Sequence, residues 1–192
     1  MKTSILLLLT LFSLLACQKE SKIQPKVTPI TTTTTTTVVA TTKADTIPDK
    51  AAFKIQLFKD TINNDETMFV FNKAAKPGYD ANEDAIYFPG NGLESLASIA
   101  IDGTDLAISD LPYAPGMSIG LDVKTKADGK FSLIMSYQNK IPANIQIWLK
   151  DAYLKDSVNV RTTNYNFNVI KADTNSFGSK RFKLIFKDGG SK

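Results

Sequence analysis

The feature that most constrains the fold of this chain is an alternation of apolar and polar residues that begins at Phe53. Apolar side chains occupy every second position in five runs: Phe53-Ile55-Leu57, Ile119-Leu121-Val123, Phe131-Leu133-Met135, Ile145-Ile147-Leu149 and Phe182-Leu184-Phe186. Successive side chains of a β-strand point to opposite faces of a sheet, so this pattern is typical of strands that bury one face. No segment with helical spacing competes with it.

Turn-forming residues separate these runs at short intervals. They are Asn63-Asn64-Asp65, Pro89-Gly90-Asn91-Gly92, Asp102-Gly103, Pro115-Gly116, Asp128-Gly129 and Gly178-Ser179. Such groups of Asn, Asp, Pro and Gly favour tight connections between strands. We therefore predict an all-β domain over residues 51–192, with about nine to eleven short strands in a two-sheet, jelly-roll-like β-sandwich.

Residue usage excludes several kinds of chemistry. The 192 residues include no His and a single Cys. This excludes Ser-His-Asp and Cys-His nucleophile systems, His-bound metal ions and an intramolecular disulfide. Only Glu66, Glu83 and Glu94 supply glutamates after residue 50, and nothing marks the carboxylate pair that a glycoside hydrolase needs. We expect a non-catalytic protein, and a small hydrolase with unmarked carboxylates is the enzyme alternative.

The basic charge of the chain does not indicate a nucleic-acid partner. The formal net charge is +4, but residues 51–192 contain 17 basic and 16 acidic residues, so the predicted domain is nearly neutral. Only Arg161 and Arg181 are arginines, the side chain that reads bases and binds phosphates in bidentate geometry. We expect no binding of nucleic acid.

Residues 1–16 have the pattern of a secretory leader. Lys2 precedes an apolar stretch over residues 5–15, and the small residue Ala16 comes just before Cys17. The stretch is shorter than the roughly 20 residues that a membrane-spanning helix needs. We predict a signal peptide that ends at residue 16.

The segment Leu14-Leu15-Ala16-Cys17 resembles the bacterial lipobox. That resemblance implies that the leader is cut before Cys17 and that Cys17 carries acyl chains such as palmitate, which hold the protein on a membrane. Gln18-Lys19-Glu20 resembles the short signal that sends many Bacteroidota lipoproteins to the outer face of the outer membrane. The expected location is the outer membrane, lipid-anchored and exposed at the cell surface, with its periplasmic face as the alternative.

Residues 17–50 are predicted to form a disordered tether that starts at the lipidated Cys17. They include seven consecutive threonines at residues 31–37, and prolines stand at positions 25, 29 and 48. Such a composition cannot bury enough apolar surface to fold. We interpret this segment as a stalk that holds the domain away from the membrane.

Three triplets resemble the Asp-Ser/Thr-aliphatic site of O-glycosylation in exported Bacteroidota proteins. They are Asp45-Thr46-Ile47, Asp60-Thr61-Ile62 and Asp156-Ser157-Val158. The candidate glycosylated residues are therefore Thr46, Thr61 and Ser157. An ordinary turn that starts at Asp60 or Asp156 is the alternative interpretation of the second and third triplets.

A longer series of motifs resembles a known β-sandwich module. In chain order the motifs are Phe71-Asn72, Pro77-Gly78-Tyr79-Asp80, Asp84-Ala85, Asp102-Gly103-Thr104-Asp105, Leu111-Pro112, Ile147-Trp148-Leu149-Lys150-Asp151, Tyr165-Asn166-Phe167 and Arg181-Phe182. The module is found near the C-terminus of Bacteroidota surface proteins, commonly before a type IX secretion sorting domain. The resemblance covers residues 52–187 and implies a β-sandwich at the cell surface. It implies no catalytic residues, and we expect Arg181 to have a structural role, in which it binds a carboxylate or loop carbonyls.

Asp80, Asn82 and Asp84 alternate in a short segment that follows a predicted strand. Oxygen ligands on every second residue can surround a hard cation, as in the first half of an EF-hand loop. Ala85 and Asn91 replace the Gly and Glu that would complete such a loop. The candidate cofactor is thus a structural Ca²⁺ bound by these three residues, and the alternative is a set of acidic turn residues that accept local N–H groups.

Trp148 is the candidate ligand-binding aromatic. Because Ile147 and Leu149 are expected to face the core, Trp148 should face outward together with Gln146 and Lys150. Exposed aromatic rings can stack on sugar rings, and Tyr87, Tyr113 and Tyr153 are further candidates. We therefore favour a non-catalytic envelope lipoprotein with a β-sandwich for binding or adhesion to a glycan or an envelope protein. A carbohydrate-binding module, with or without Ca²⁺, is the alternative.

Overall fold

The computed structural model describes residues 47–92 and 94–189. Cys17, Thr46 and the predicted leader lie outside the described residues, as does all of the predicted tether before residue 47. The strands are β1 (Ala52–Phe58), β2 (Asn64–Phe71), β3 (Ala85–Ile86), β4 (Glu94–Ile99), β5 (Asp105–Leu111), β6 (Ser118–Thr125), β7 (Gly129–Asn139), β8 (Ile145–Asp151), β9 (Asp156–Asn159), β10 (Tyr165–Val169) and β11 (Phe182–Asp188). A short 3₁₀ helix, η1 (Thr174–Ser176), precedes β11. The prediction of an all-β domain is confirmed.

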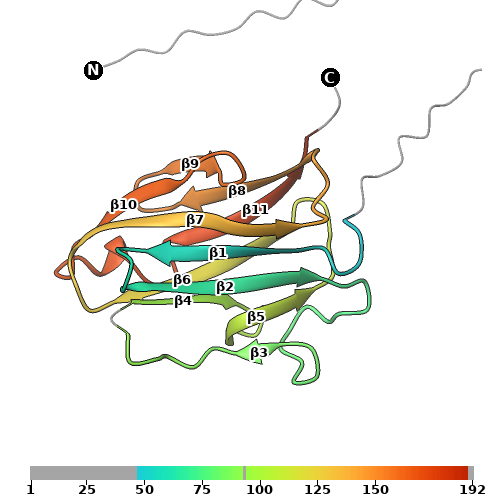
Figure 1. The fold of residues 1–192 in the computed structure, drawn as a ribbon, viewed down its shortest axis with the longest axis horizontal. Helices are drawn as coiled ribbons and strands as arrows, with labels where there is room; N and C mark the ends of the chain where they lie inside the picture. Colours follow the sequence, from blue (N-terminus) through green and yellow to red (C-terminus); the bar gives the residue numbers. More distant parts are fainter. Residues whose placement is uncertain (1–46, 93, 190–192) are drawn as a thin grey trace, which may run out of the picture. The chain divides into compact units, whose positions relative to one another are not determined.

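The strands form one hydrogen-bonded series that folds over into two facing layers. Their order is β10-β7-β1-β2-β5-β4-β6-β11-β8-β9, with β3 paired to β5. Strands β10, β7, β1 and β2 make one layer and β6, β11, β8 and β9 the other, while β5 and β4 carry the sheet between them (Figure 1). The pairs are antiparallel except β2 with β5, which run parallel over residues 68–71 and 108–111. The result is a sandwich-like β fold.

The core lies between the layers and uses the alternating residues that the sequence predicts. Phe53 of β1 stacks on Phe69 of β2, with ring centroids 4.6 Å apart. Across the layers, Phe53 meets the edge of Phe186 of β11 at 5.9 Å. Near the other end, Phe167 of β10 contacts Phe182 of β11 at 4.8 Å. Each fully buried Phe or Leu contributes about 1.5–3 kcal/mol, so the alternation is the main source of stability.

The folded domain begins earlier than the predicted boundary at residue 51. The side chain of Ile47 is 3% exposed and belongs to the core. The next residues are tied to strand β2, because the Lys50 N–H donates to the Phe71 carbonyl and the Lys73 N–H donates to the Asp49 carboxylate. The apolar side chain of Ile47 therefore extends the domain into the segment that composition assigned to the tether.

Several predicted turns lie between strands, and Asp102-Gly103 is the clearest case, whereas Asn64 and Asp65 of the predicted turn 63–65 begin β2 instead. Residues 101–103 form a turn between β4 and β5, with Gly103 at a φ of 88°. The Asp102 carboxylate accepts the N–H groups of Thr104 and Tyr79, at 3.0 Å and 3.2 Å. An L residue with a side chain is strained at such a positive φ, which explains the glycine.

Candidate functional site

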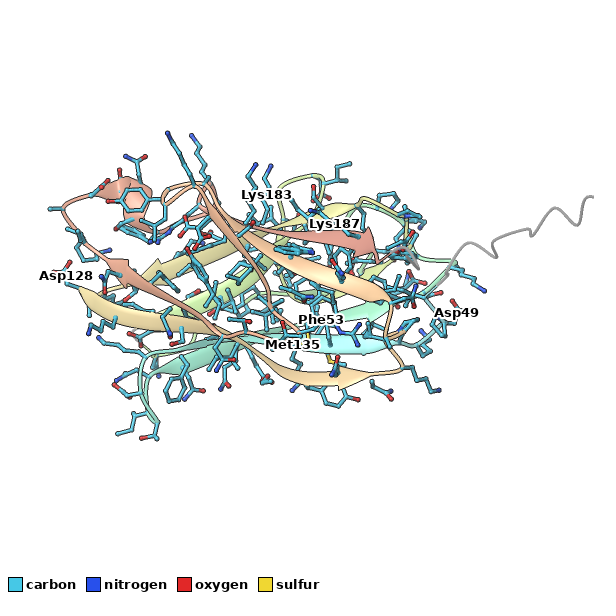
Figure 2. The ribbon with its side chains drawn as sticks, turned by 90° about the horizontal axis from the view of Figure 1, so that it is seen from above. Asp49, Phe53, Asp128, Met135, Lys183 and Lys187 are labelled. Carbon is cyan, nitrogen blue, oxygen red and sulfur yellow. The ribbon has the colours of Figure 1, made fainter. Side chains whose placement is uncertain are left out.

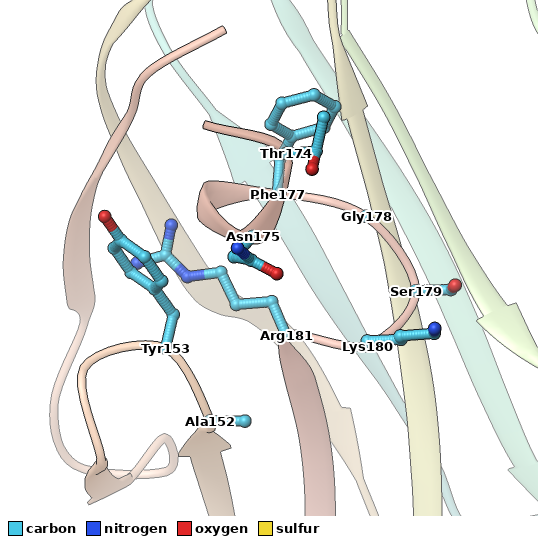
Figure 3. Close-up of a pocket in the computed structure, with 9 residues that line it drawn as sticks. All are labelled: Ala152, Tyr153, Thr174, Asn175, Phe177, Gly178, Ser179, Lys180 and Arg181. Carbon is cyan, nitrogen blue, oxygen red and sulfur yellow. The ribbon is translucent and has the colours of Figure 1, made fainter. Parts of the chain in front are cut away.

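A pocket of about 550 Å³ lies beside the end of β8. It lies between the turn that follows β8 and the loop that carries η1 into β11 (Figure 3). The volume is within the usual range of small-ligand sites. The residues that line it are Ala152, Tyr153, Thr174, Asn175, Phe177, Gly178, Ser179, Lys180 and Arg181.

The loop on one side of the pocket is held by its own hydrogen bonds. Asp173 caps η1, and its carboxylate accepts the Asn175 N–H at 3.0 Å. The Ser176 hydroxyl donates to the carbonyl of Ile170 and accepts the N–H of the same residue, at 2.8 Å and 2.9 Å. Lys171 places its ammonium 4.0 Å from the centroid of the Phe177 ring. These contacts give the pocket a fixed wall.

Arg181, which lines the pocket, forms a buried ion pair with Asp151. Arg181 is 3% exposed and Asp151 is fully buried. The Nη2 of Arg181 donates to the Asp151 carboxylate at 2.8 Å, and Nε donates to the same group at 3.1 Å. The Nη1 of Arg181 donates to the carbonyls of Asn168 and Ser176. The predicted structural role of Arg181 is confirmed, since it binds both a carboxylate and loop carbonyls.

Tyr153 covers this ion pair from the pocket side. Its ring centroid lies 4.9 Å from the guanidinium carbon of Arg181, and Figure 3 shows the ring beside the guanidinium. The Tyr153 hydroxyl donates to Asp173 at 2.8 Å, and its backbone N–H donates to Asp151 at 2.8 Å. Two contacts hold the side chain and a third holds the backbone, while 37% of the residue is exposed.

The pKa values of the acids and tyrosines at this site are shifted away from neutrality. Burial raises the pKa of Asp151, but hydrogen bonds from Arg181 and the Leu154 N–H outweigh it and leave the pKa below its ordinary value. The Asn175 N–H and Tyr153 lower the pKa of Asp173. The hydrogen bond to Asp173 raises the pKa of Tyr153. Burial, followed by the hydrogen bond to Asp151, raises the pKa of Tyr165.

Asp151 is not among the predicted site residues, although the sequence contains a signal for it. Ile145, Ile147 and Leu149 alternate on the inward face of β8, and Asp151 is the next residue in that alternation. An acid on an inward face needs a buried partner, which points to one of the two arginines of the chain. The pocket itself has no such signal, because its walls come from loops that only the folded chain brings together.

The predicted calcium residues form a turn whose oxygens accept hydrogen bonds. One Asp80 oxygen accepts the Lys76 ammonium at 2.6 Å, and the other accepts the Asn82 N–H at 3.0 Å. The Asp84 oxygens accept the backbone N–H groups of Asp80 and Asp110, at 2.8 Å and 2.7 Å. Among the described residues, no three His, Cys, Asp or Glu side chains group closely enough to hold a metal ion. Calcium binding by these residues stays a prediction.

Trp148 faces outward from β8, as the alternation predicts. Ile147 and Leu149 are buried, whereas Trp148 is half-buried and Lys150 is exposed. The Trp148 Nε1 donates to Gln146 Oε1 at 2.8 Å, and the Lys187 ammonium lies 4.9 Å from the ring. The predicted orientation of Trp148 is confirmed, and its binding role stays a prediction.

The candidate tyrosines Tyr87 and Tyr113 each contact other parts of the sheet. Tyr87 follows β3, and its hydroxyl donates to Asp65 at 2.6 Å. Burial, then that hydrogen bond, raises its pKa to about 12. Tyr113 follows β5, and its ring meets the core ring of Phe71 edge-on at 5.8 Å. The Tyr113 hydroxyl donates to Asp188 of β11 at 2.7 Å. A ligand-binding role for Tyr87 and Tyr113 beside Trp148 stays a prediction.

Two of the three candidate glycosylation residues are described. Thr61 lies in the exposed turn between β1 and β2, where the Asp60 carboxylate accepts the N–H groups of Ile62 and Asn63. Ser157 is exposed on β9, the strand at one end of the sheet. Both hydroxyl-bearing residues are accessible, and Asp60 also has the turn role of the alternative interpretation.

The comparisons with known proteins give no relative. No protein-family model matches the chain, and neither a curated protein nor a solved structure matches it. The described part of the chain contains no helix long and apolar enough to cross a membrane.

Proposed function

We propose that this protein is a non-catalytic envelope lipoprotein that displays its β-sandwich as a binding module. The lipobox-like segment at Cys17 supplies the anchor, and residues 18–46 supply the stalk. The domain that begins by Ile47 supplies the binding surface. By its resemblance to the Bacteroidota surface module, the chain belongs on the outer membrane, where its partner is a glycan or an envelope protein.

The observation that supports the non-catalytic proposal is the direction of the pKa shifts in and around the pocket that Tyr153 lines. A general acid or base works best when its pKa is near the working pH. Here the pKa values of Asp151 and Asp173 are lowered and those of Tyr153 and Tyr165 are raised. All four shifts lead away from the pKa near the working pH that a general acid or base needs, which favours a binding role.

Lipid labelling tests the anchored display. Cells that express the full chain are fed an alkyne-tagged fatty acid, and the protein is then partitioned between detergent and water. We expect the label and detergent partitioning to depend on Cys17, with Cys17→Ser unlabelled and aqueous. A wild-type chain that stays unlabelled and aqueous would overturn the proposal.

The orientation of Trp148 favours a second candidate function, a carbohydrate-binding module. The Trp148 ring stands on the outer face of the sheet. The Lys187 ammonium lies over the ring, and the Gln146 amide accepts a hydrogen bond from the Trp148 Nε1. This arrangement differs from the pocket at Tyr153, so the two sites can be tested separately. Binding of the full chain to a broad glycan array, with and without Ca²⁺, tests this candidate. Loss of the signals in Trp148→Ala is the expected result, and an array with no signals contradicts it.

A further inference from the structure

The outer face of β8 and β11 carries an unusual arrangement of charge. The strands are antiparallel and place Lys183 directly opposite Lys150, Ile185 opposite Trp148, and Lys187 opposite Gln146. Opposite residues of an antiparallel pair share a face, so these six side chains form three adjacent rows. We call this set the Trp148 face. Its six positions include three lysines and no acid.

The lysines of the Trp148 face are not neutralised by neighbours. Lys150, Lys183 and Lys187 are exposed, and none forms an ion pair with another described residue. The outward acid nearest to Lys183 on β6 is Asp122, which is bound to Lys124 at 2.8 Å. Like charges directly opposite in a sheet destabilise it. The repulsion between Lys183 and Lys150 is thus not offset by an ion pair with any described acid.

The other groups of the face suit sugar rings. Trp148 stands in the middle row, and its ring has the Lys187 ammonium at 4.9 Å. Gln146 adds an amide, and the next strand, β9, places Ser157 opposite Lys150 and Asn159 opposite Trp148. Aromatic, amide and hydroxyl groups contact sugar rings and their hydroxyls, and the lysines attract anions. Figure 2 shows Lys183 and Lys187 on the side of β11 away from the core residue Phe53.

We propose that the Trp148 face binds an acidic polysaccharide, with Trp148 against a sugar ring and Lys150, Lys183 and Lys187 on its carboxylate or sulfate groups. The inference rests on the second candidate function and names its ligand class. Charge complementarity selects this occupant, because three unpaired cations surround the only tryptophan of the chain. A neutral glycan would leave the lysine pair uncompensated.

A sulfated glucan, its uncharged parent and a sugar-free polyanion together test the inference. The full chain with Cys17→Ser, which removes the acyl chains, is titrated with dextran sulfate, with uncharged dextran and with polyphosphate. We expect dextran sulfate to bind more tightly than dextran and to bind more weakly as salt is added. The triple variant Lys150→Gln, Lys183→Gln, Lys187→Gln should lose about tenfold in affinity for dextran sulfate, since exposed ion pairs contribute modestly but add up.

Control variants distinguish specific binding at the Trp148 face from general attraction between the protein and a polyanion. The control triple Lys73→Gln, Lys126→Gln, Lys130→Gln removes the same charge from exposed positions elsewhere and should leave the affinity within about twofold. Trp148→Phe, which keeps an aromatic ring, and Trp148→Ala should weaken dextran sulfate binding in that order of severity while polyphosphate binding stays unchanged. Circular dichroism confirms that each variant is folded.

Other results overturn the inference in distinguishable ways. Equal losses in both lysine triples would show unspecific attraction of polyanions. Binding of dextran that depends on Trp148 but not on the lysines would keep the carbohydrate-binding function and reject the acidic class. Binding of vesicles that contain phosphatidylglycerol in preference to dextran sulfate would assign the face to a lipid surface. No binding of any polymer would reject the inference and leave the lipid-labelling result unaffected.

Discussion

Arg181 and Asp151 form a buried ion pair at the place where strand β10 meets the opposite layer. Asp151 ends β8, Arg181 immediately precedes β11, and both accept or donate hydrogen bonds to β10 as well. The Tyr165 hydroxyl donates to Asp151 at 3.0 Å, and Arg181 Nη1 donates to the Asn168 carbonyl at 2.9 Å. The pair therefore joins the two layers and supports the pocket above it.

Removal of the arginine should destabilise the domain strongly. Arg181→Met leaves the Asp151 carboxylate buried without its cation, and we expect a loss of about 3–5 kcal/mol in the free energy of unfolding. Arg181→Lys should lose less free energy of unfolding than Arg181→Met but should stay less stable than the wild type, because an ammonium cannot replace the bidentate contact. Urea denaturation at neutral pH measures both.

Arg161→Met is the matched control for that experiment. Arg161 donates to the carbonyls of Pro142 and Ile141 and faces no carboxylate in the described structure, so its loss should cost less. The double variant Arg181→Met, Asp151→Leu should recover stability relative to Arg181→Met alone. A cost below about 1 kcal/mol for Arg181→Met would contradict the account of the ion pair.

Acid should destabilise the domain through Asp151. The folded-state pKa of Asp151 is below its ordinary value of 3.8, so the folded protein binds this proton less readily than the unfolded chain. The stability that the carboxylate contributes is present above that ordinary value and is lost as the pH falls through the folded-state pKa. Asp151→Asn should lower stability at neutral pH and flatten its dependence below about pH 4. The control is Asp102→Asn, which removes an acid of an exposed turn whose pKa is also lowered. If Asp151→Asn leaves the pH dependence of stability unchanged, Asp151 is not the group responsible for the acid sensitivity.

A second buried acid has a weaker partner. The Glu94 side chain is 0% exposed, its oxygens accept no hydrogen bond within the described structure, and the Lys59 ammonium lies 3.7 Å from Oε1. Lys59→Met should cost about 1–3 kcal/mol, because the buried charge loses its counter-ion. Lys59→Met with Glu94→Leu should recover that loss in thermal unfolding. A double variant that is no more stable than Lys59→Met would show that Glu94 is not the cause.

A calcium titration tests the predicted site at residues 80–84. Ca²⁺ must compete with the Lys76 ammonium, which lies 2.6 Å from Asp80. We therefore expect the unfolding midpoint to rise only at Ca²⁺ concentrations of about 0.1–1 mM, with Asp80→Asn and Asp84→Asn removing the rise. Mg²⁺ serves as the control cation. A midpoint that stays constant across the titration leaves Asp80, Asn82 and Asp84 as turn residues alone.

The strands could be predicted because their signal is local. Alternating residues such as Phe53, Ile55 and Leu57 identify a strand without knowledge of its neighbours, and Asp102-Gly103 identifies a turn in the same way. The outward direction of Trp148 follows from the same alternation. The start of the domain was placed too late, because a single apolar residue such as Ile47 has no period that would distinguish it from the tether.

The pocket could not be predicted because its parts are distant in the chain. Tyr153 follows β8, whereas Asn175 and Gly178 belong to the loop before β11, and only the pairing of β8 with β11 brings them together. Whether Tyr87 and Tyr113 act together with Trp148 depends on the same long-range pairing. Residue type suggested an aromatic site, but sheet order decides which rings share a face.

The position of β1 has a mechanical consequence for a domain held at its N-terminus. β1 follows Ile47 and is hydrogen-bonded along its length to β2 on one side and β7 on the other. These bonds run across the strand direction, so a force that pulls β1 along its own axis loads them together, in shear. Under the proposed N-terminal anchor, tension on the chain would therefore load β1 in shear.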